Sequence, residues 1–341
     1  MTSRGRVRPS CGLRSRPRAD RRGQPGHSVT ETAQRVARRE VPLAQFGLAG
    51  FPCAFLMCRC DALPLRLGGG TRHIFVRKPI SSHSMHRIRK VLLGILIIFL
   101  LPLAVHAALY VSKARPASFR DADWSSVGML PAADADREAR FLVFTGRTGR
   151  WKGIFAVHSW VVFKPENATT WSRYDVVGWG QPVRTNAWAP DGRWFGDTPR
   201  VLIDVRGPAA ADLIPKVKAA ITAYSYSHFG DYRIWPGPNS NTFTATVLRA
   251  VPELATTLPS NAVGKDFRAH PYVGLTDSGT GVEASLWGLL GMKLGWVEGL
   301  EVNVLGLVAG LDFRHPAVKL PGLGRIGVAD GTAIAAPAQT N

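Results

Sequence analysis

The feature that most constrains this chain is Val91–Ser112, a stretch of 22 residues without Asp, Glu, Lys or Arg and rich in leucine and isoleucine. As a helix with a rise of about 1.5 Å per residue, it is long enough to cross a hydrocarbon layer about 30 Å thick. The short head before it begins at Met85 and carries Arg87, Arg89 and Lys90. These basic residues predict that the N-terminal end of the segment lies in the cytoplasm and that the following chain lies outside.

Two fates of this segment fit the sequence. Val105-His106-Ala107 satisfies the small-residue rule of a secretory cleavage site, so residues 85–112 read either as an uncleaved anchor or as a signal peptide. We favour the anchor. The sequence then predicts a single-pass inner-membrane protein whose main domain lies in the periplasm, with the membrane contacted through residues 91–112. If the segment is cleaved, the domain is secreted or periplasmic.

The net charge of +19 is distributed unevenly along the chain. Residues 1–84 hold 16 basic and 4 acidic side chains, whereas residues 113–341 hold 24 basic and 20 acidic ones. A nucleic-acid-binding domain is expected to be strongly basic over one face, and the nearly balanced C-terminal part is not. The sequence therefore predicts no nucleic-acid partner for the main domain.

Residues 1–84 are predicted to be a disordered basic extension, because they show no sustained apolar period and are interrupted by proline and glycine. A basic binding arm and a transit peptide both fit this composition. We favour an over-extended reading frame with the true start at Met85, where a complete targeting signal begins. All four cysteines lie in this segment, and the spacing Cys58-Arg59-Cys60 does not fit a zinc site. The main domain therefore has neither a thiol nucleophile nor disulfides.

After a linker at 113–139, residues 140–327 read as an exported α+β domain, and residues 328–341 as a disordered tail. Four segments rich in Val, Phe and Trp are followed by two segments of helical period, which predicts a mainly antiparallel sheet with two helices. Asp212 fits the N-cap of the first helix. The predicted strands are 140–145, 154–163, 171–179 and 201–205, and the predicted helices are 213–224 and 240–251.

Glycine interrupts an apolar run from about residue 280 onward. Leu300–Val304 alternates apolar and polar side chains as a half-buried strand does. A second membrane span is the alternative, but Lys293, Glu298 and Glu301 make it costly. We expect glycine-broken strands or membrane-proximal packing here.

Two places in the domain suggest chemistry. His158 lies within a strand of otherwise apolar and aromatic residues, and a Pro/Gly-rich loop beginning at Trp235 leads into a helix at Ser240. A helix N-terminus offers free N–H groups that stabilise the oxyanion formed when a nucleophile attacks a carbonyl. A histidine on a neighbouring strand is suited to accept the proton of that nucleophile.

This order of residues is similar to that of the circularly permuted papain-like hydrolases, which include the lecithin–retinol acyltransferase-like proteins. In those proteins a histidine in an early strand precedes a helix start of the form Asn-X-Asn-Thr-Phe, where X is a cysteine nucleophile. The matching positions here are His158 and Ser240, so serine stands in place of cysteine. The resemblance implies a permuted papain-like fold and acyl-transfer or hydrolytic chemistry.

From about residue 140 to 327 the chain more closely resembles the bacterial family called domain of unknown function 3750, whose name implies no activity. The resemblance lies in His158-Ser159-Trp160-Val161-Val162-Phe163-Lys164-Pro165, in Gly237-Pro238-Asn239-Ser240-Asn241-Thr242-Phe243, in Leu294-Gly295-Trp296 and in Glu301-Val302-Asn303-Val304.

Each candidate site residue has a structural alternative. Ser240 is an ideal N-cap by type, and His158 fits a hydrogen-bonded core histidine. Either Tyr174 or Asp175, on the next strand, is the expected partner that orients His158. The remaining candidates are ligand-binding residues: Asn239 and Asn241, which fit oxyanion donors or Asx-turns, and the aromatic Trp160 and Trp235.

The sequence thus predicts a membrane-anchored envelope protein whose His158/Ser240 cleft binds or hydrolyses an amide or ester. The alternative is a non-catalytic envelope module that uses the same cleft, or the glycine-rich C-terminal third, for a partner or lipid. No phosphate loop, paired catalytic carboxylates or metal-ligand spacing occurs, so we expect no metal and no cofactor.

Overall fold

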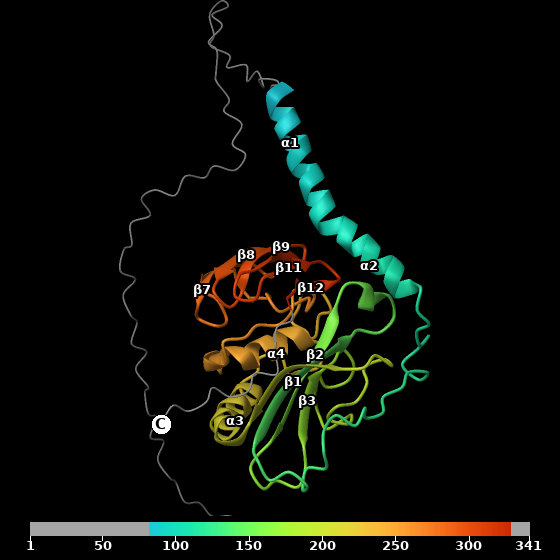
Figure 1. Cartoon of the computed structure of the whole chain (residues 1–341), viewed down its shortest axis with the longest axis vertical. Coiled ribbons are helices and arrows are strands. Elements are labelled where there is room, and N and C mark those ends of the chain that lie inside the picture. Colours follow the sequence, from blue (N-terminus) through green and yellow to red (C-terminus); the bar gives the residue numbers. More distant parts are fainter. Residues whose placement is uncertain (1–81, 329–341) are drawn as a thin grey trace, which may run out of the picture. The chain divides into compact units, whose positions relative to one another are not determined.

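The computed structural model describes residues 82–328. Our expectations for the segment before residue 82, including the cysteines and the reading frame, and for the tail from residue 329 fall outside this range. The described chain begins with a continuous helix made of α1 (Ser82–Ile95), a π-helical turn η1 (Leu96–Leu100) and α2 (Leu101–Val111) (Figure 1).

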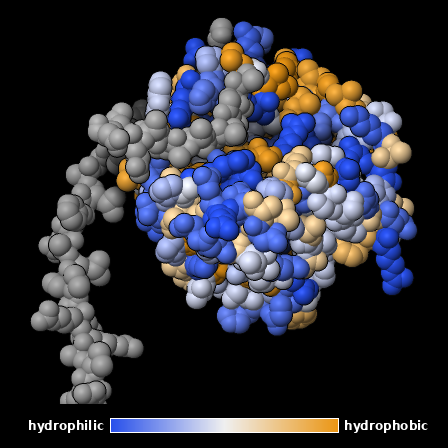
Figure 2. All heavy atoms as spheres, turned by 60° about the horizontal axis from the view of Figure 1, so that its bottom comes forward, coloured by the Kyte–Doolittle hydropathy of each residue, from blue (hydrophilic) through white to orange (hydrophobic). Residues whose placement is uncertain are grey.

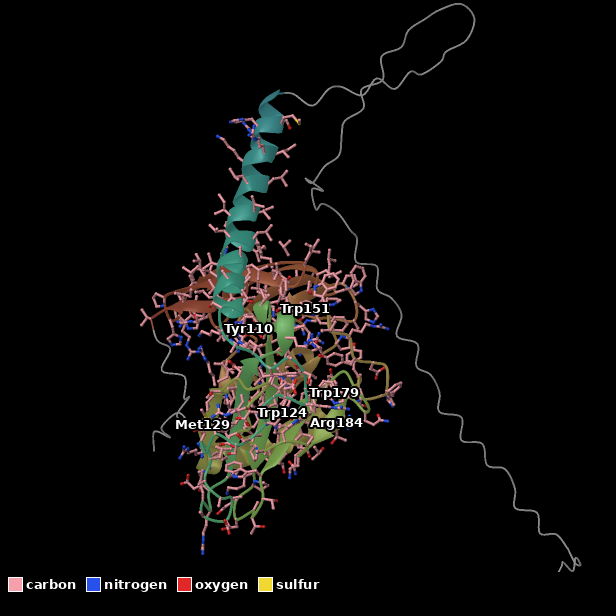
Figure 3. All side chains as sticks on the ribbon, turned by 90° about the vertical axis from the view of Figure 1, so that its right-hand side faces the viewer. Tyr110, Trp124, Met129, Trp151, Trp179 and Arg184 are labelled. Carbon is pink, nitrogen blue, oxygen red and sulfur yellow. The ribbon has the colours of Figure 1, made fainter. Side chains whose placement is uncertain are left out.

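This helix contains the predicted membrane segment. Among the described residues, Ser84–Val111 is the one helix long and apolar enough to cross a membrane, which is compatible with the predicted anchor. Most of its side chains are exposed, and Figure 3 shows those of α1 spreading to both sides of the helix. The C-terminal end does contact the domain. His106 Nδ1 lies 2.7 Å from the carbonyl oxygen of Ile154, and the Tyr110 hydroxyl donates to that of Arg150 at 2.9 Å.

The first sheet is antiparallel, as predicted, with its strands in the order β4-β3-β2-β1-β5. Alternation along β1 separates two cores: Phe141 and Val143 face the helices α3 and α4, whereas Leu142 and Phe144 face a cluster of tryptophans. The strands are β1 (Arg140–Arg147), β2 (Val157–Lys164), β3 (Ser172–Val176), β4 (Val183–Thr185) and β5 (Arg200–Arg206).

The two predicted helices of the domain are α3 (Gly207–Thr222) and α4 (Ser240–Arg249). The predicted N-cap of the first one is wrong, because α3 begins five residues before Asp212 and has Arg206 at its N-cap. Pro208 occupies the first turn of α3, where a missing N–H costs nothing. The Gly-Pro pair that we read only as the end of a strand therefore also starts the helix.

Residues 113–139 form no helix or strand, yet they pack on the domain. Ser126 forms an isolated β-bridge with Gly192. The ring of Trp124 lies edge-on to that of Trp194, with centroids 5.1 Å apart, and so joins the tryptophan cluster. The segment that we read as a linker therefore contributes to the core on the tryptophan side of the first sheet.

The C-terminal third forms a second antiparallel sheet, a meander of seven strands in chain order, and not a second membrane-spanning helix. Glycines with positive φ, such as Gly288 and Gly306, lie in the tight turns between strands, where other residues are strained. The strands are β6 (Tyr272–Leu275), β7 (Gly281–Leu286), β8 (Leu290–Gly295), β9 (Gly299–Val304), β10 (Leu307–Asp312), β11 (Ala317–Leu320) and β12 (Gly324–Gly327).

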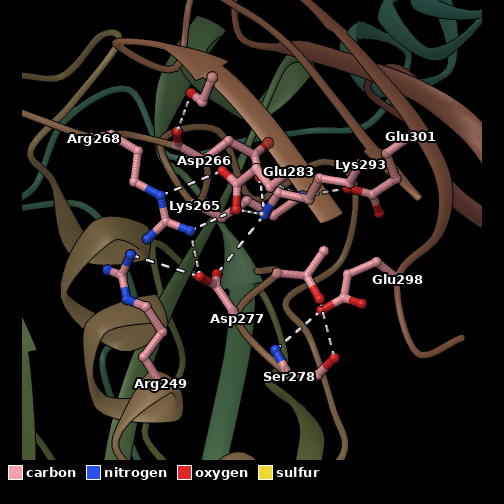
Figure 4. A network of polar contacts seen from close by, with 12 residues as sticks. Arg249, Lys265, Asp266, Arg268, Asp277, Ser278, Glu283, Lys293, Glu298 and Glu301 are labelled. Carbon is pink, nitrogen blue, oxygen red and sulfur yellow. Dashed lines mark hydrogen bonds and ion pairs between the residues drawn. The ribbon is translucent and has the colours of Figure 1, made fainter. Parts of the chain in front are cut away.

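One face of this second sheet is polar and buried against the rest of the domain (Figure 4). The register places Glu283 opposite Lys293 and Lys293 opposite Glu301, so opposite charges alternate across neighbouring strands. Lys293 Nζ lies 2.7 Å from Asp266, and Lys319 Nζ lies 2.6 Å from Glu301. The sheet is therefore attached to the domain by buried ion pairs instead of an apolar core.

Candidate active site

The candidate site begins with a buried histidine on β2. His158 is 3% exposed and points toward the tryptophan cluster, because alternation along β2 turns its neighbours Val157 and Ser159 to the helix side. Its ring stacks on that of Trp194, with centroids 3.7 Å apart and planes 6° from parallel. The ring plane and position of His158 are therefore set by an aromatic neighbour.

Asp175 and Arg173 complete a buried polar group around this histidine. His158 Nε2 lies 2.9 Å from Asp175 Oδ1. Arg173 donates to both carboxylate oxygens of Asp175, at 2.7 and 2.9 Å, and its guanidinium lies 4.3 Å from the ring centroid of Trp160. All three charged or titratable side chains are almost completely buried. The histidine is held by a carboxylate that is itself held by an arginine.

This arrangement keeps His158 neutral. Burial lowers the pKa of His158 below its ordinary value, although the hydrogen bond to Asp175 acts in the opposite direction. Burial would raise the pKa of the Asp175 carboxyl, but Arg173 and His158 together hold it below its usual range. Because ionised Asp175 accepts only, neutral His158 carries its proton on Nε2. Its Nδ1, which has no hydrogen-bond partner within residues 82–328, is then the free proton acceptor.

The second component lies at the start of α4. Asn239 is the N-cap of this helix: its side-chain oxygen accepts from the N–H groups of Asn241 and Thr242, and Thr242 completes a capping box. A capping role for Ser240 is therefore wrong. Ser240 is the first residue of the helix, and its hydroxyl has no hydrogen-bond partner in the described part of the chain.

The two asparagines that we selected as ligand-binding residues hold the helix start in place. The side-chain amide of Asn239 donates to the carbonyl oxygen of Val263 at 3.1 Å. The amide of Asn241 donates to that of Val157 at 2.9 Å, and its oxygen accepts from Ser159 at 2.8 Å. These bonds join α4 to β2 at the residues on either side of His158.

His158 and Ser240 line the same cavity, which has a volume of about 420 Å³. Its walls are largely aromatic, and several wall residues, among them Trp151 and Trp179 (labelled in Figure 3), are substantially exposed at its rim. The cavity is therefore an apolar pocket with few polar groups. Its aromatic lining comprises Trp151, Phe155, Trp179, Trp194, Phe195, Tyr232 and Trp235.

The other predicted site residues lie in different places. Trp235 lines the cavity and donates from its indole N–H to the carbonyl oxygen of Leu305 at 2.8 Å. Trp160 does not line the cavity; it is fully buried, with its ring centroid 5.8 Å from that of His158. The ring of Tyr174 stacks on Phe163 in the helix-facing core. Of the two proposed partners of His158, the structure brings Asp175 into contact with it.

Sequence reasoning did not select two residues of this site, Arg173 and Trp194. Arg173 and Asp175 are two apart on a strand, so alternation places both on one face, and this spacing was a usable signal for the ion pair. Trp194 had no such signal, because it comes from a loop between β4 and β5.

A second and larger cavity, of about 930 Å³, lies where the end of α2 meets the two sheets, and neither His158 nor Ser240 lines it. Its lining is strongly basic, and only Asp197 and Asp312 oppose the positive charges. The basic residues are Lys113, Arg115, Arg147, Arg200, Arg314, Lys319 and Arg325. In the described residues no group of three or more His, Cys, Asp or Glu side chains is placed to hold a metal ion.

No curated protein and no solved structure matches this chain significantly. Residues 138–267 match the model of a family described as "Protein of unknown function (DUF3750)". The matched range contains the whole first sheet, α3 and α4, and therefore both His158 and Ser240, but it ends before the second sheet. The match supports placing residues 138–267 of this chain in the DUF3750 family.

Proposed function

We propose that this protein is a membrane-anchored hydrolase of the cell envelope that cleaves an amide or ester with a large apolar portion. One observation carries the proposal: His158, oriented by Asp175 and with a free Nδ1, lines the same apolar cavity as the unpartnered hydroxyl of Ser240. A nucleophile and a neutral, oriented base that line one ligand-sized space are the components that acyl transfer requires.

In the proposed reaction, Ser240 Oγ attacks the substrate carbonyl carbon and its proton passes to His158 Nδ1. The protonated imidazole then gives this proton to the departing nitrogen or oxygen as the scissile bond breaks, which leaves an acyl-serine. Water, deprotonated by the same histidine, hydrolyses the acyl-serine and restores both residues. The ion pair with Arg173 keeps Asp175 ionised, so that the carboxylate stabilises the transient imidazolium.

The developing oxyanion has a donor at the helix start. Asn239 already occupies the N–H groups of Asn241 and Thr242. The N–H of Ser240, which has no partner among the described residues, is the group left to stabilise the oxyanion, together with the positive end of the α4 dipole. The aromatic walls favour a substrate whose acyl or leaving group is apolar.

The chain order supports a permuted papain-like arrangement, with the histidine strand before the nucleophile helix. The basic head of residues 85–90 and the apolar helix after it support an inner-membrane anchor with the domain in the periplasm. The envelope is therefore the proposed source of the substrate.

The test uses the purified full-length protein and a fluorophosphonate probe that acylates activated serines. We expect labelling of the wild type, loss of labelling in Ser240→Ala and strong reduction in His158→Gln. Ser260→Ala is the matched control. Its hydroxyl is also buried and unpartnered, but it lines the larger cavity and not the one that contains His158. Equal labelling of the wild type and Ser240→Ala would refute the hydrolase.

A second candidate function is non-catalytic binding of an anionic envelope component, which the seven basic residues of the larger cavity favour. Inorganic pyrophosphate is a suitable probe in a calorimetric titration of the full chain. We expect Arg200→Glu, a change in this cavity, to weaken binding at least tenfold. The same reversal at Lys218, on the exposed side of α3, leaves binding unchanged. If the fluorophosphonate does not label the protein and the protein binds pyrophosphate in this way, the result would favour the binding module.

A further inference from the structure

The outward face of the second sheet is apolar across its full width. The cross-strand pairs connect Leu275 to Val282, Val282 to Leu294, and so on without interruption to the last strand. Each of the seven strands contributes one aliphatic side chain to this row. The row comprises Leu275, Val282, Leu294, Leu300, Leu311, Val318 and Ile326.

These side chains face the surroundings of the molecule and not its core. Leu275 is 62% exposed, Val282 60% and Ile326 52%, and a neighbouring row adds Val273 and Met292 to the same face. A monomeric water-soluble protein rarely exposes a contiguous apolar patch of more than a few hundred Å². A seven-stranded apolar face therefore needs an occupant.

The register shows that this apolar face is not a core face that a one-residue shift in strand pairing has turned outward. The opposite face carries the row Glu283, Lys293, Glu301 and Lys319, whose ion pairs with one another and with the domain are buried (Figure 4). Shifting any strand by one residue would put these charges outside and break the pairs. The sheet is fixed with its polar face inward and its apolar face outward, the reverse of a sheet that faces water.

The apolar helix meets this same sheet. The π-helical turn η1 contacts β10, and Phe99 of this turn is buried. Farther along the helix, Leu103 lies against Gly322 in the turn between β11 and β12. These contacts place the sheet beside the middle of the uncharged segment.

The position of this contact determines which medium surrounds the sheet. The part of the helix after η1 packs on the domain, where His106 and Tyr110 are buried, whereas the side chains before η1 are mostly exposed. If this exposed part of the helix lies in lipid, β10 lies at the level where the helix leaves the lipid. A sheet with an open edge cannot cross the hydrocarbon, because its edge N–H and C=O groups would be unpaired. It can lie flat on the membrane with one face in contact with lipid.

The distribution of polar residues elsewhere agrees with this orientation. Figure 2 brings the lower side of Figure 1 forward, and this face is mainly hydrophilic, with hydrophobic residues gathered toward the upper edge of the view. Basic side chains also lie where the end of α2 meets the second sheet, among them Lys113 and Arg325. Basic groups beside an apolar face are suited to the anionic headgroups at a membrane surface.

We propose that the outward face of the second sheet is a membrane-seated surface, which inserts its aliphatic row into the leaflet beside η1, where the apolar helix leaves the lipid. The lipid bilayer is the occupant. The depth is that of an interfacial amphipathic element, about 5–10 Å into the boundary between headgroups and acyl chains. The helix and the sheet then hold the domain at a fixed height and orientation on the membrane.

The test uses the full chain, reconstituted into phospholipid vesicles, with its four native cysteines replaced by serine and one nitroxide label at a time. The labelled variants are Val282→Cys and Val318→Cys on the sheet, and Leu93→Cys on the exposed helix as the lipid reference. Ala219→Cys, on the exposed side of α3, is the water reference. Relaxation of each label by oxygen, which concentrates in lipid, is compared with relaxation by a nickel chelate, which stays in water.

We expect the oxygen-to-nickel ratio at the two sheet positions to approach that at Leu93→Cys and to exceed that at Ala219→Cys severalfold. A ratio equal to that of Ala219→Cys would overturn the proposal. Protection from both reagents would also overturn it, because the face would then be covered by protein, such as a second copy of this chain. A photoactivatable lipid provides a second measurement on the unmutated protein, in which we expect crosslinks to peptides of β7, β8 and β11.

Discussion

At the scale of single residues, Asp175 has two roles: it neutralises the buried charge of Arg173, and it orients His158. We predict that Asp175→Asn lowers the free energy of unfolding by about 3–5 kcal/mol, since Arg173 would remain as a buried and unpaired cation. Chemical denaturation measures this change. Asp231→Asn is the control, because its partner His228 is exposed, and a change below about 1 kcal/mol is expected there. Equal effects of the two substitutions would contradict the prediction.

The lowered pKa of His158 gives a second prediction at this scale. Only the neutral imidazole accepts a proton, so probe labelling of Ser240 should stay near its plateau as the pH falls through 6.5, the ordinary value for histidine. It should decline only at lower pH. The unfolded chain binds a proton at the ordinary pKa, so the stability contributed by His158 is lost as the pH falls below 6.5. Labelling rates between about pH 5 and 8 test this. Half-maximal labelling above pH 6.5 would contradict it.

The residue pattern predicted part of this site. A histidine in an apolar strand and an acid on the next strand were visible in the sequence, and the structure joins His158 to Asp175. The position of Trp194 was not visible, because stacking between a loop residue and a strand residue leaves no period in the sequence. The cap of α4 was assigned to the wrong residue, because both Asn239 and Ser240 are good caps by type and only the backbone separates them.

At the scale of elements, the start of α4 places a structural residue, the N-cap Asn239, next to the proposed nucleophile, Ser240. We predict that Ser240→Ala changes the free energy of unfolding by less than about 0.5 kcal/mol, because the hydroxyl makes no hydrogen bond in the described chain. Asn239→Ala should cost about 1–2 kcal/mol or more, because it removes the cap and the bond to Val263. Thermal and chemical denaturation measure both. A larger loss in Ser240→Ala than in Asn239→Ala would show that the serine stabilises the helix.

Element positions followed from apolar period more reliably than their ends did. Four of the five strands of the first sheet and the start of α4 were predicted closely, because alternating Val, Phe and Trp residues and a Pro/Gly loop mark them, but the short β4 was missed. The start of α3 was missed, because Gly207-Pro208 suits both a strand end and a first helical turn. In the second sheet the period predicted strands but not the inward face. Alternation separates two faces without saying which one meets the protein.

At the scale of the whole molecule, the basic residues before the apolar segment predict which side of the membrane the domain occupies. Arg87, Arg89 and Lys90 precede the apolar part of the helix, so we predict that residues 113–328 lie outside the cytoplasm. An alkaline phosphatase reporter, which needs disulfides and is therefore active only outside the cytoplasm, should be active when fused to the C-terminus. The same reporter fused after Lys90 should be inactive.

Reversing the three basic residues to glutamate tests the cause of this orientation. If they set it, the activity of the C-terminal fusion should fall severalfold while its amount in the membrane stays the same. An inactive C-terminal fusion in the unmutated chain would place the domain in the cytoplasm. The His158/Ser240 cavity would then face cytoplasmic substrates and not those of the envelope. The apolar face of the second sheet would still need lipid in that case, because the contact between η1 and β10 does not depend on which side of the membrane the domain occupies. The reporter therefore tests the location of the chemistry separately from the seating of the domain on the membrane.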